Sequence, residues 1–170
     1  MPAVVCVGRC DTVEQKGPGD RITHRWEGKF GVIDTNGTYV ANPQFDSMNN
    51  FFDGLAAVCV GAGCRGFTIL SDEKLEERWG FVDRQAHLVI PHQFEKVDDF
   101  SEGLAKVCIE KCKTEPLWGY IDTAGKVVIT PQFDSADSFY DGIADVKIGK
   151  PPNERAGYID RSGRYVVNPQ

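Results

Sequence analysis

The chain has 170 residues, of which 41% are hydrophobic, so it can bury one globular core and needs no second domain. Acidic residues outnumber basic ones by 25 to 19, and the formal net charge of −6 argues against a broad surface for nucleic acid. No apolar run approaches the roughly 20 residues of a membrane-spanning helix, and the Met-Pro-Ala start lacks the basic and apolar regions of a signal peptide. We therefore expect neither nucleic-acid binding nor membrane insertion.

The same pattern of residues recurs along the chain. Its opening glycines are separated by 49, 39 and 38 residues, a period typical of stacked or radially arranged repeats: Gly31, Gly80, Gly119 and Gly157. The predicted organisation is one array of residues 1–170, made of a partial unit 1–25, units 26–75, 76–114 and 115–152, and a partial unit 153–170. Because the chain starts and stops within a repeat, we expect a fragment of a longer array rather than a closed ring.

Each unit is predicted to contain short strands. Residues 119–122 and 126–130 are rich in β-branched and aromatic side chains, and residues 122–125 between them supply the Asp and Gly of a tight turn. Residues 142–147 form a third strand after a loop or single helical turn at 134–141. The fold class is therefore all-β: a tandem repeat of short antiparallel strands, about three per unit, in an open solenoid-like or propeller-like array. The extra residues of the first interval, 61–78, read as a polar loop insertion.

Turns and aromatic side chains recur in register. The aspartates three residues after each glycine are interpreted as turn acceptors rather than metal ligands: Asp34, Asp83, Asp122 and Asp160. Where residues 83–86 lack the turn glycine, we expect strain or a different shape. Burial between neighbouring units explains the repeated rings better than ligand stacking does: Phe45, Trp79, Phe94, Trp118 and Phe133.

The recurring motifs are similar to those of a known family of repeat proteins. Trp79-Gly80 and Trp118-Gly119, each followed by an aromatic residue, an aliphatic residue and Asp, then segments such as V-I-T-P-Q-F and F-x-x-G-L/I-A-x-V, resemble the WG (KWG) β-repeat family. Phe30-Gly31 and Ala156-Gly157 depart from it because they lack the tryptophan. The resemblance implies a β-rich scaffold or interaction module without recognised shared catalytic residues.

The six cysteines form pairs at one place in the repeat, just after the third strand: Cys6 and Cys10, Cys59 and Cys64, Cys108 and Cys112. If that strand turns back into the next one, the two cysteines of a pair flank the loop and face each other, which favours a disulfide within each pair. Free thiols and a zinc site that recruits cysteines from two units stay open as alternatives. An even number of cysteines indicates an extracytoplasmic, secreted or periplasmic protein, and reduced cysteines would indicate the cytoplasm instead.

Acidic residues, with one asparagine among them, form three rows after the Pro-Gln-Phe segment: Asp46, Glu95 and Asp134; Asn49, Asp98 and Asp137; Asp53, Glu102 and Asp141. Such rows are expected on a solvated face, where we predict that a basic or cation-bridged protein partner would bind. The sequence shows no catalytic spacing of its three histidines, no nucleophile elbow and no phosphate-binding loop, so we expect no catalytic, cofactor-binding or metal-binding residues. The favoured function is a non-enzymatic scaffold for protein–protein interaction. The alternatives are an enzyme that acts on cell-surface polymers through a carboxylate pair, and a metal- or redox-responsive protein that uses the cysteine pairs.

Overall fold

The structure is a computed structural model that describes residues 2–8, 13–16, 22–25, 28–61, 64 and 77–170. Within this part of the chain the architecture is all-β, and no helix is long and apolar enough to cross a membrane. The predicted loop insertion at 61–78 lies mostly outside the described residues.

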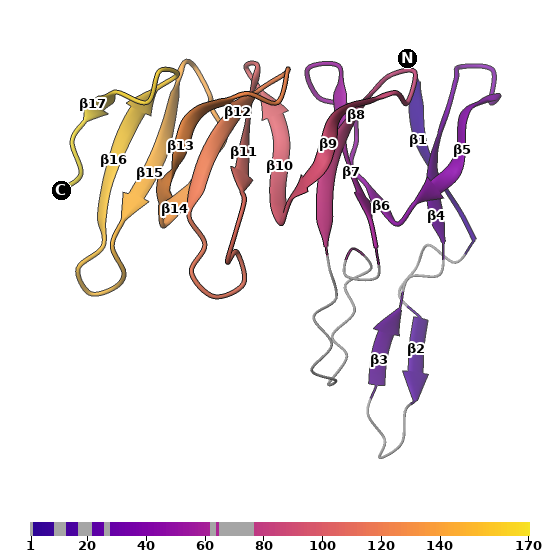
Figure 1. The fold of residues 1–170 in the computed structure, drawn as a ribbon, viewed down its shortest axis with the longest axis horizontal. Coiled ribbons are helices and arrows are strands. Elements are labelled where there is room, and N and C mark those ends of the chain that lie inside the picture. The colour runs from indigo at the N-terminus through magenta and orange to yellow at the C-terminus, as the bar shows by residue number, and fades with distance from the viewer. Residues whose placement is uncertain (1, 9–12, 17–21, 26–27, 62–63, 65–76) are drawn as a thin grey trace.

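Four antiparallel sheets follow one another along the long axis of the described structure (Figure 1). Sheet 1 contains β1 (Ala3–Val7), β4 (Lys29–Ile33) and β5 (Tyr39–Phe45). Sheet 2 contains β6 (Ser47–Met48), β7 (Leu55–Val60), β8 (Arg78–Asp83) and β9 (Leu88–Phe94). Sheet 3 contains β10 (Lys96–Ser101), β11 (Leu104–Cys108), β12 (Trp118–Asp122) and β13 (Val127–Phe133). Sheet 4 contains β14 (Ser135–Ala136), β15 (Ile143–Ile148), β16 (Arg155–Asp160) and β17 (Tyr165–Val167), and β2 (Val13–Lys16) pairs with β3 (Ile22–Arg25) in a separate hairpin.

Each sheet combines the late part of one sequence repeat with the early part of the next. The last strand of one unit pairs antiparallel with the first strand of the following unit, as β7 pairs with β8 and β11 with β12. A sheet therefore cannot form from one sequence unit alone, which makes neighbouring units depend on each other. The all-β tandem array is confirmed, and its two ends lie far apart in an open row (Figure 1).

The prediction of about three strands per unit was incomplete. The segments expected to be a loop or helical turn contain a further strand, β6, β10 or β14, which pairs at the edge of its sheet. In β10 the register shifts between Val97 and Phe100, so the strand is irregular and its side chains do not alternate cleanly. Because its side chains do not alternate regularly between two faces, this strand could not be recognised from the sequence pattern.

The turn aspartates have the predicted role. Asp122 Oδ1 accepts hydrogen bonds from Ala124 N at 3.0 Å and Lys126 N at 2.9 Å, and Asp34, Asp83 and Asp160 repeat the arrangement. Ala86, which replaces the turn glycine, adopts φ 62°, close to the φ of 81° at Gly125. The expected strain at this turn is confirmed, because a residue with a Cβ disfavours that region.

The glycine after each tryptophan position allows two strands to approach closely. A Cβ on Gly119 would lie 2.4 Å from the carbonyl oxygen of Ile129 and 2.6 Å from the nitrogen of Pro131. Gly31, Gly80 and Gly157 make the same approach, and the register shifts across Gly31, Gly80 and Gly119 in their strand pairs. Only a hydrogen fits at this position, which explains why glycine opens every unit.

Hydrophobic cores lie between successive sheets. The repeated phenylalanines are buried as predicted, with Phe45, Phe94 and Phe133 7%, 3% and 1% exposed. Trp79 and Trp118 also pack against these cores, as predicted, but they are only partly buried. The Nζ of Lys106 lies 4.9 Å from the centre of a Trp118 ring.

Candidate functional site

The first acidic row holds in place the loops that follow β7, β11 and β15. Carboxylate oxygens of Asp46, Glu95 and Asp134 accept hydrogen bonds from loop amides, those of Gly61 at 3.0 Å, Cys112 at 3.0 Å and Gly149 at 2.8 Å, respectively. Asp46 is 5% exposed and pairs with Lys29 at 2.7 Å. These carboxylates stabilise loop backbone that would otherwise lack acceptors, and the row does not form the solvated face expected from the sequence.

The row containing Asp53, Glu102 and Asp141 links one unit to the next. Asp53 Oδ2 accepts a hydrogen bond from the amide of Gly103 at 2.7 Å, and Glu102 Oε2 accepts one from Gly142 at 3.0 Å. All three acidic residues have positive φ, between 49° and 53°. Asp141, at the end of this series, is exposed, and the described residues provide no hydrogen-bond donor to its carboxylate.

In the middle row, Asn49 and Asp98 each bind another side chain, and Asp137 forms no side-chain hydrogen bond or ion pair with the described residues. Asn49 Nδ2 donates to Asp99 Oδ1 at 2.8 Å across the boundary between sheets 2 and 3. Burial raises the pKa of the Asp99 carboxyl, the hydrogen bond from Asn49 opposes this, and the Asp98 carboxylate adds to the rise. Asp98 pairs with Lys106 at 3.1 Å, whereas the Asp137 side chain is exposed. Of the predicted partner-binding residues, Asp137 and Asp141 remain available, and Asp98 is half-exposed.

Two of the predicted disulfides form within their pairs. Cys59 is bonded to Cys64 and Cys108 to Cys112, with Cα atoms 5.7 and 5.9 Å apart. Cys6 is also disulfide-bonded, and Cys10 lies outside the described residues. Such bridges are typical of proteins from an oxidising environment.

The geometry of the bridges differs from the prediction. The Cα atom opposite Cys59 on the neighbouring strand belongs to Trp79, not to the second cysteine. Cys112 lies in the loop that follows β11. Each bridge therefore ties the end of a strand to the start of its own loop, because the loop turns back after only a few residues.

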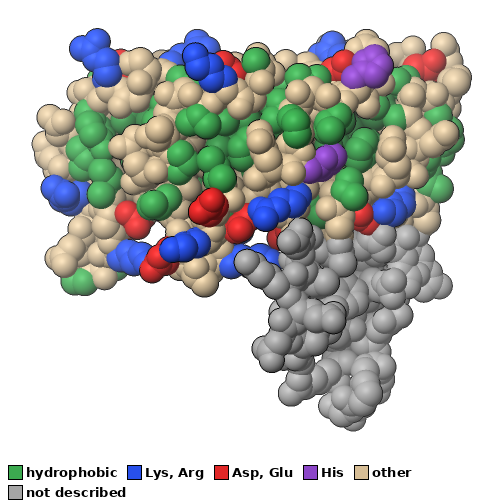
Figure 2. Space-filling view, in the orientation of Figure 1, with side chains coloured by type: hydrophobic (Ala, Val, Ile, Leu, Met, Phe, Trp, Pro, Cys, Tyr) green, Lys and Arg blue, Asp and Glu red, His purple; other side chains and the backbone are tan. Residues whose placement is uncertain are grey.

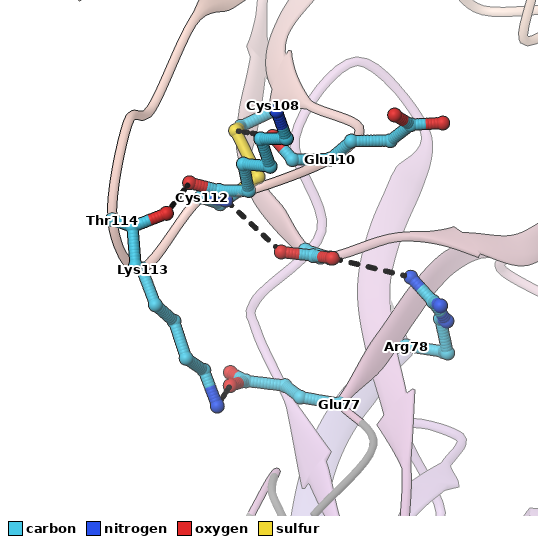
Figure 3. Close-up of polar contacts among 9 residues, drawn as sticks. Glu77, Arg78, Cys108, Glu110, Cys112, Lys113 and Thr114 are labelled. Carbon is cyan, nitrogen blue, oxygen red and sulfur yellow. Dashed lines mark hydrogen bonds and ion pairs between the residues drawn. A yellow bond between two sulfur atoms is a disulfide. The ribbon is translucent and has the colours of Figure 1, made fainter. Parts of the chain in front are cut away.

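A hollow of about 570 Å³ lies beside the Cys108–Cys112 bridge. In Figure 3, Lys113 points towards Glu77, with Nζ 3.8 Å from Oε2. The carboxylate of Glu95 accepts the hydrogen bond from the Cys112 amide and also lies near Arg78, whose Nη1 is 3.9 Å from Glu95 Oε1. The positive charges of Lys113 and Arg78 thus lie close to the negative charges of Glu77 and Glu95 in the hollow. In the part of the chain that the structure describes, no three His, Cys, Asp or Glu side chains are placed to hold a metal ion.

A set of exposed hydrophobic side chains was missed in the sequence. Two consecutive residues on each of the edge strands β5, β9, β13 and β17 are between 38% and 59% exposed. We call them the edge pairs: Tyr39 and Val40, Leu88 and Val89, Val127 and Val128, Tyr165 and Val166. The face shown in Figure 2 carries a band of hydrophobic side chains that runs from one end of the array to the other. Consecutive apolar residues in a strand suggest burial on both faces, so only the position at a sheet edge shows them to be exposed.

Comparison with known proteins yields one family. The model of the WG containing repeat matches residues 30–63, 79–111 and 118–150, which together make up more than half of the chain. No curated protein and no solved structure matches the sequence. The matched stretches contain the buried phenylalanines and three of the four close-approach glycines and turn aspartates described above, Gly157 and Asp160 lying beyond them, and the chain belongs to the WG containing repeat family.

Proposed function

We propose that the chain is a non-enzymatic interaction module that binds a protein partner through the edge pairs. The observation that supports this function is that hydrophobic side chains stay exposed at the same two positions in four successive sheets. The turn aspartates and most of the row carboxylates are instead occupied by hydrogen bonds within the array. The edge pairs are thus a repeated feature that the fold itself does not use.

The size of the surface suits a protein partner. Burying a whole Val, Leu or aromatic side chain contributes about 1.5–3 kcal/mol, so covering the exposed half of each contributes about 1 kcal/mol. A partner that covers most of the eight side chains would gain enough to offset the entropy lost on association. A partner that covers a single pair would not, which makes an extended contact along the array necessary.

Recognition by an added β-strand is disfavoured at these edges. Pro43, Pro91 and Pro131 lie within β5, β9 and β13, and proline has no amide hydrogen to donate to an incoming strand. Side-chain contacts with the edge pairs would therefore provide most of the affinity.

The basic or cation-bridged partner expected from the acidic rows forms the second candidate. The exposed carboxylates of Asp137 and Asp141 favour it. The strands β6, β10 and β14 that border the acidic rows occupy the other edge of each sheet from the edge pairs. Variants can therefore separate the two surfaces.

The disulfides are proposed to be staples in a secreted or periplasmic protein rather than a redox switch. Cys59, Cys108 and Cys112 are 0%, 0% and 1% exposed, so reductants reach these residues poorly. Catalysis by a carboxylate pair has no comparable support, because the described carboxylates of the first acidic row bind backbone amides.

The test is affinity capture under non-reducing conditions with three immobilised forms of the chain: wild type, Val89→Lys/Val128→Lys and Asp137→Asn/Asp141→Asn. Retained proteins are identified and their affinities measured by interferometry with purified partner. We expect a partner that the lysine variant loses and the asparagine variant keeps, with little dependence on salt. Loss in the asparagine variant together with strong salt dependence would instead establish the basic partner, and equal binding to all three forms would reject both surfaces.

A further inference from the structure

The hollow of about 570 Å³ beside the Cys108–Cys112 bridge lies between two interior sheets. Sheet 2 contributes Arg78 and Gln93 to its wall, and sheet 3 contributes Lys96 and the loop 109–114 that follows β11. Small-molecule sites in proteins have volumes of about 300–1,000 Å³. The hollow is therefore large enough for a small ligand.

The charged groups in the hollow are only loosely paired. Lys113 Nζ lies 3.8 Å from Glu77 Oε2, and Arg78 Nη1 lies 3.9 Å from Glu95 Oε1. Charge-assisted hydrogen bonds are about 2.7–2.9 Å long, so the donors of Lys113 and Arg78 are too distant to bond these carboxylates. The hollow brings together four basic and three acidic side chains: Arg78, Lys96, Lys111 and Lys113; Glu77, Glu95 and Glu110.

Three of these side chains have no internal partner at all. In the part of the chain that the structure describes, the ammonium groups of Lys96 and Lys111 form no hydrogen bond or ion pair. The same holds for the carboxylate of Glu110, whose backbone carbonyl alone is engaged, by Cys108 Sγ. The hollow thus offers both donors and acceptors that the fold leaves unused.

The equivalent ion pair of the first unit is closed. Lys29 stands two residues before its repeat glycine, as Arg78 does, and its Nζ lies 2.7 Å from the carboxylate of Asp46, the equivalent of Glu95. In the third unit an uncharged residue, Leu117, takes this position. The guanidinium of Arg78 therefore keeps hydrogen-bond donors that the matching lysine of the first unit spends within the fold.

Two further residues of the hollow depart from the repeat. Lys96 stands where the other units have serine, at 47 and 135, and Glu110 stands where they have glycine, at 61 and 149. Gly61 and Gly149 donate their amides to the first acidic row, but in this loop the amide of Cys112 does so instead. The other units form the same kind of sheet without these charges, so the fold does not require them.

The charged loop is fixed by covalent and hydrogen bonds. The disulfide closes it between Cys108 and Cys112, and the Cys112 amide donates to Glu95 Oε2 at 3.0 Å. The amides of Thr114 and Glu115 donate to the Lys111 carbonyl at 3.1 and 2.8 Å, which completes a tight turn. Because the loop is held in this way, a ligand loses little affinity to ordering it.

The mixture of charges indicates the chemistry of the ligand. Three carboxylates would repel a polyanion, and four basic groups would repel a polycation, whereas a ligand with one charge of each sign is attracted by both. A guanidinium such as that of Arg78 forms two parallel hydrogen bonds with a carboxylate. Glu110 supplies an acceptor for an ammonium group, and Gln93 and Thr114 supply polar groups for a peptide amide.

We propose that this hollow binds a short peptide with two free ends. Arg78 and Lys96 receive the terminal carboxylate, Glu110 receives the terminal ammonium group, and Ile109 contacts the apolar part of the ligand. In Figure 3, Glu110 and Arg78 extend from different segments, the loop after β11 and the start of β8. None of the edge pairs lines the hollow, so this site is separate from the surface proposed for the protein partner.

The test is titration of the oxidised, ¹⁵N-labelled full chain with trialanine, N-acetyl-trialanine and trialanine amide, followed by the amide signals in NMR spectra. The acetylated peptide lacks the positive charge and the amide lacks the negative charge, and the three ligands are otherwise alike. We expect trialanine to shift the signals of residues 109–114 with a dissociation constant of about 1 mM or lower. Each modified peptide should bind at least about tenfold more weakly, since each loses a charge-assisted hydrogen bond.

Two variants assign the ends of the peptide. Arg78→Gln should weaken trialanine and bind it no better than trialanine amide, and Glu110→Gln should bind it no better than the acetylated form. Both side chains are largely exposed, so circular dichroism should show an unchanged fold. Arg155→Gln is the matched control, because Arg155 has the repeat position of Arg78 in the last unit and does not line the hollow.

Several results would overturn the proposal. These are the absence of shifts in residues 109–114 with trialanine, equal affinity for trialanine and either modified peptide, and an Arg78→Gln or Glu110→Gln variant that discriminates as wild type does. A loss of binding in Arg155→Gln equal to that in Arg78→Gln would overturn it as well. The edge-pair variant Val89→Lys/Val128→Lys should still bind trialanine, so the two proposed functions are tested independently.

Discussion

Replacement of Gly119 by alanine should destabilise the protein more than its small size suggests. The added Cβ would lie 2.4 Å from the Ile129 oxygen, 2.6 Å from the Pro131 nitrogen and 2.8 Å from the Thr130 carbon. All three atoms belong to the backbone of β13, so no side-chain rotation can relieve the contact. An ordinary approach of carbon to a carbonyl oxygen is about 3.3 Å, which requires β12 and β13 to separate by about 1 Å.

This separation would disturb a tightly packed region. Tyr120, Ile129 and Phe133 beside the glycine are between 1% and 4% exposed, and the hydroxyl of Tyr120 donates to the Asp137 carbonyl at 2.7 Å. Overpacking in such cores costs typically 1–3 kcal/mol, and we expect about 3 kcal/mol here because rigid backbone opposes the methyl group. For a chain of this size that corresponds to a melting temperature lower by about 6–12 °C.

The measurement is urea unfolding followed by circular dichroism, with Gly142→Ala as the control. A methyl group at Gly142 meets no atom within 4 Å, and the cost there comes only from its φ of 79°, about 1–2 kcal/mol. Gly119→Ala should therefore lower the free energy of unfolding more than Gly142→Ala does. If the two variants were equally stable, or Gly119→Ala the more stable, close approach would not be the reason for glycine in the repeat.

The remaining predictions concern the Cys108–Cys112 disulfide, the half-buried ring of Trp118 and the half-buried carboxylate of Asp99. Cys108→Ser/Cys112→Ser should lower the free energy of unfolding by about 2 kcal/mol, as expected for so short a closed loop, and in a thermal melt with reductant, which also opens the other bridges, wild type and variant should unfold at the same temperature. Trp118→Ala should lower the free energy of unfolding by about 2 kcal/mol, less than the 3–5 kcal/mol expected for a fully buried ring. An unchanged midpoint of urea unfolding would place the ring outside the core. Asp99→Asn should stabilise the protein at pH 7, because burial raises the pKa of this carboxyl above its ordinary 3.8 and folding thus disfavours its charge. The gain should disappear below that ordinary pKa, where Asp99 is protonated in both states, and a gain that persists at pH 3 would contradict this explanation.

Local chemistry explains what could be read without coordinates. Asp122 and Gly125 specify a turn through contacts within five residues, and Phe133 recurs in phase because every unit must bury the same face. The pairing of Cys108 with Cys112 is similarly local, since four residues separate them. Turn positions, the repeated core and the disulfide partners were therefore predictable, along with the all-β array.

Tertiary structure decided which repeated residues remain available for a partner. The carboxylates of Glu95 and Asp134 resemble solvated charges in the sequence, yet each binds an amide 15 to 17 residues further along the chain, and Glu102 binds one 40 residues away. Val127 and Val128 resemble core residues, yet they lie on an edge strand and remain exposed. The period of the repeat shows that a position is used in the same way in each unit, but not whether it faces solvent, an amide or the next sheet. That depends on how sheets from different units pack, because burial is set by contacts between segments that are distant in the chain.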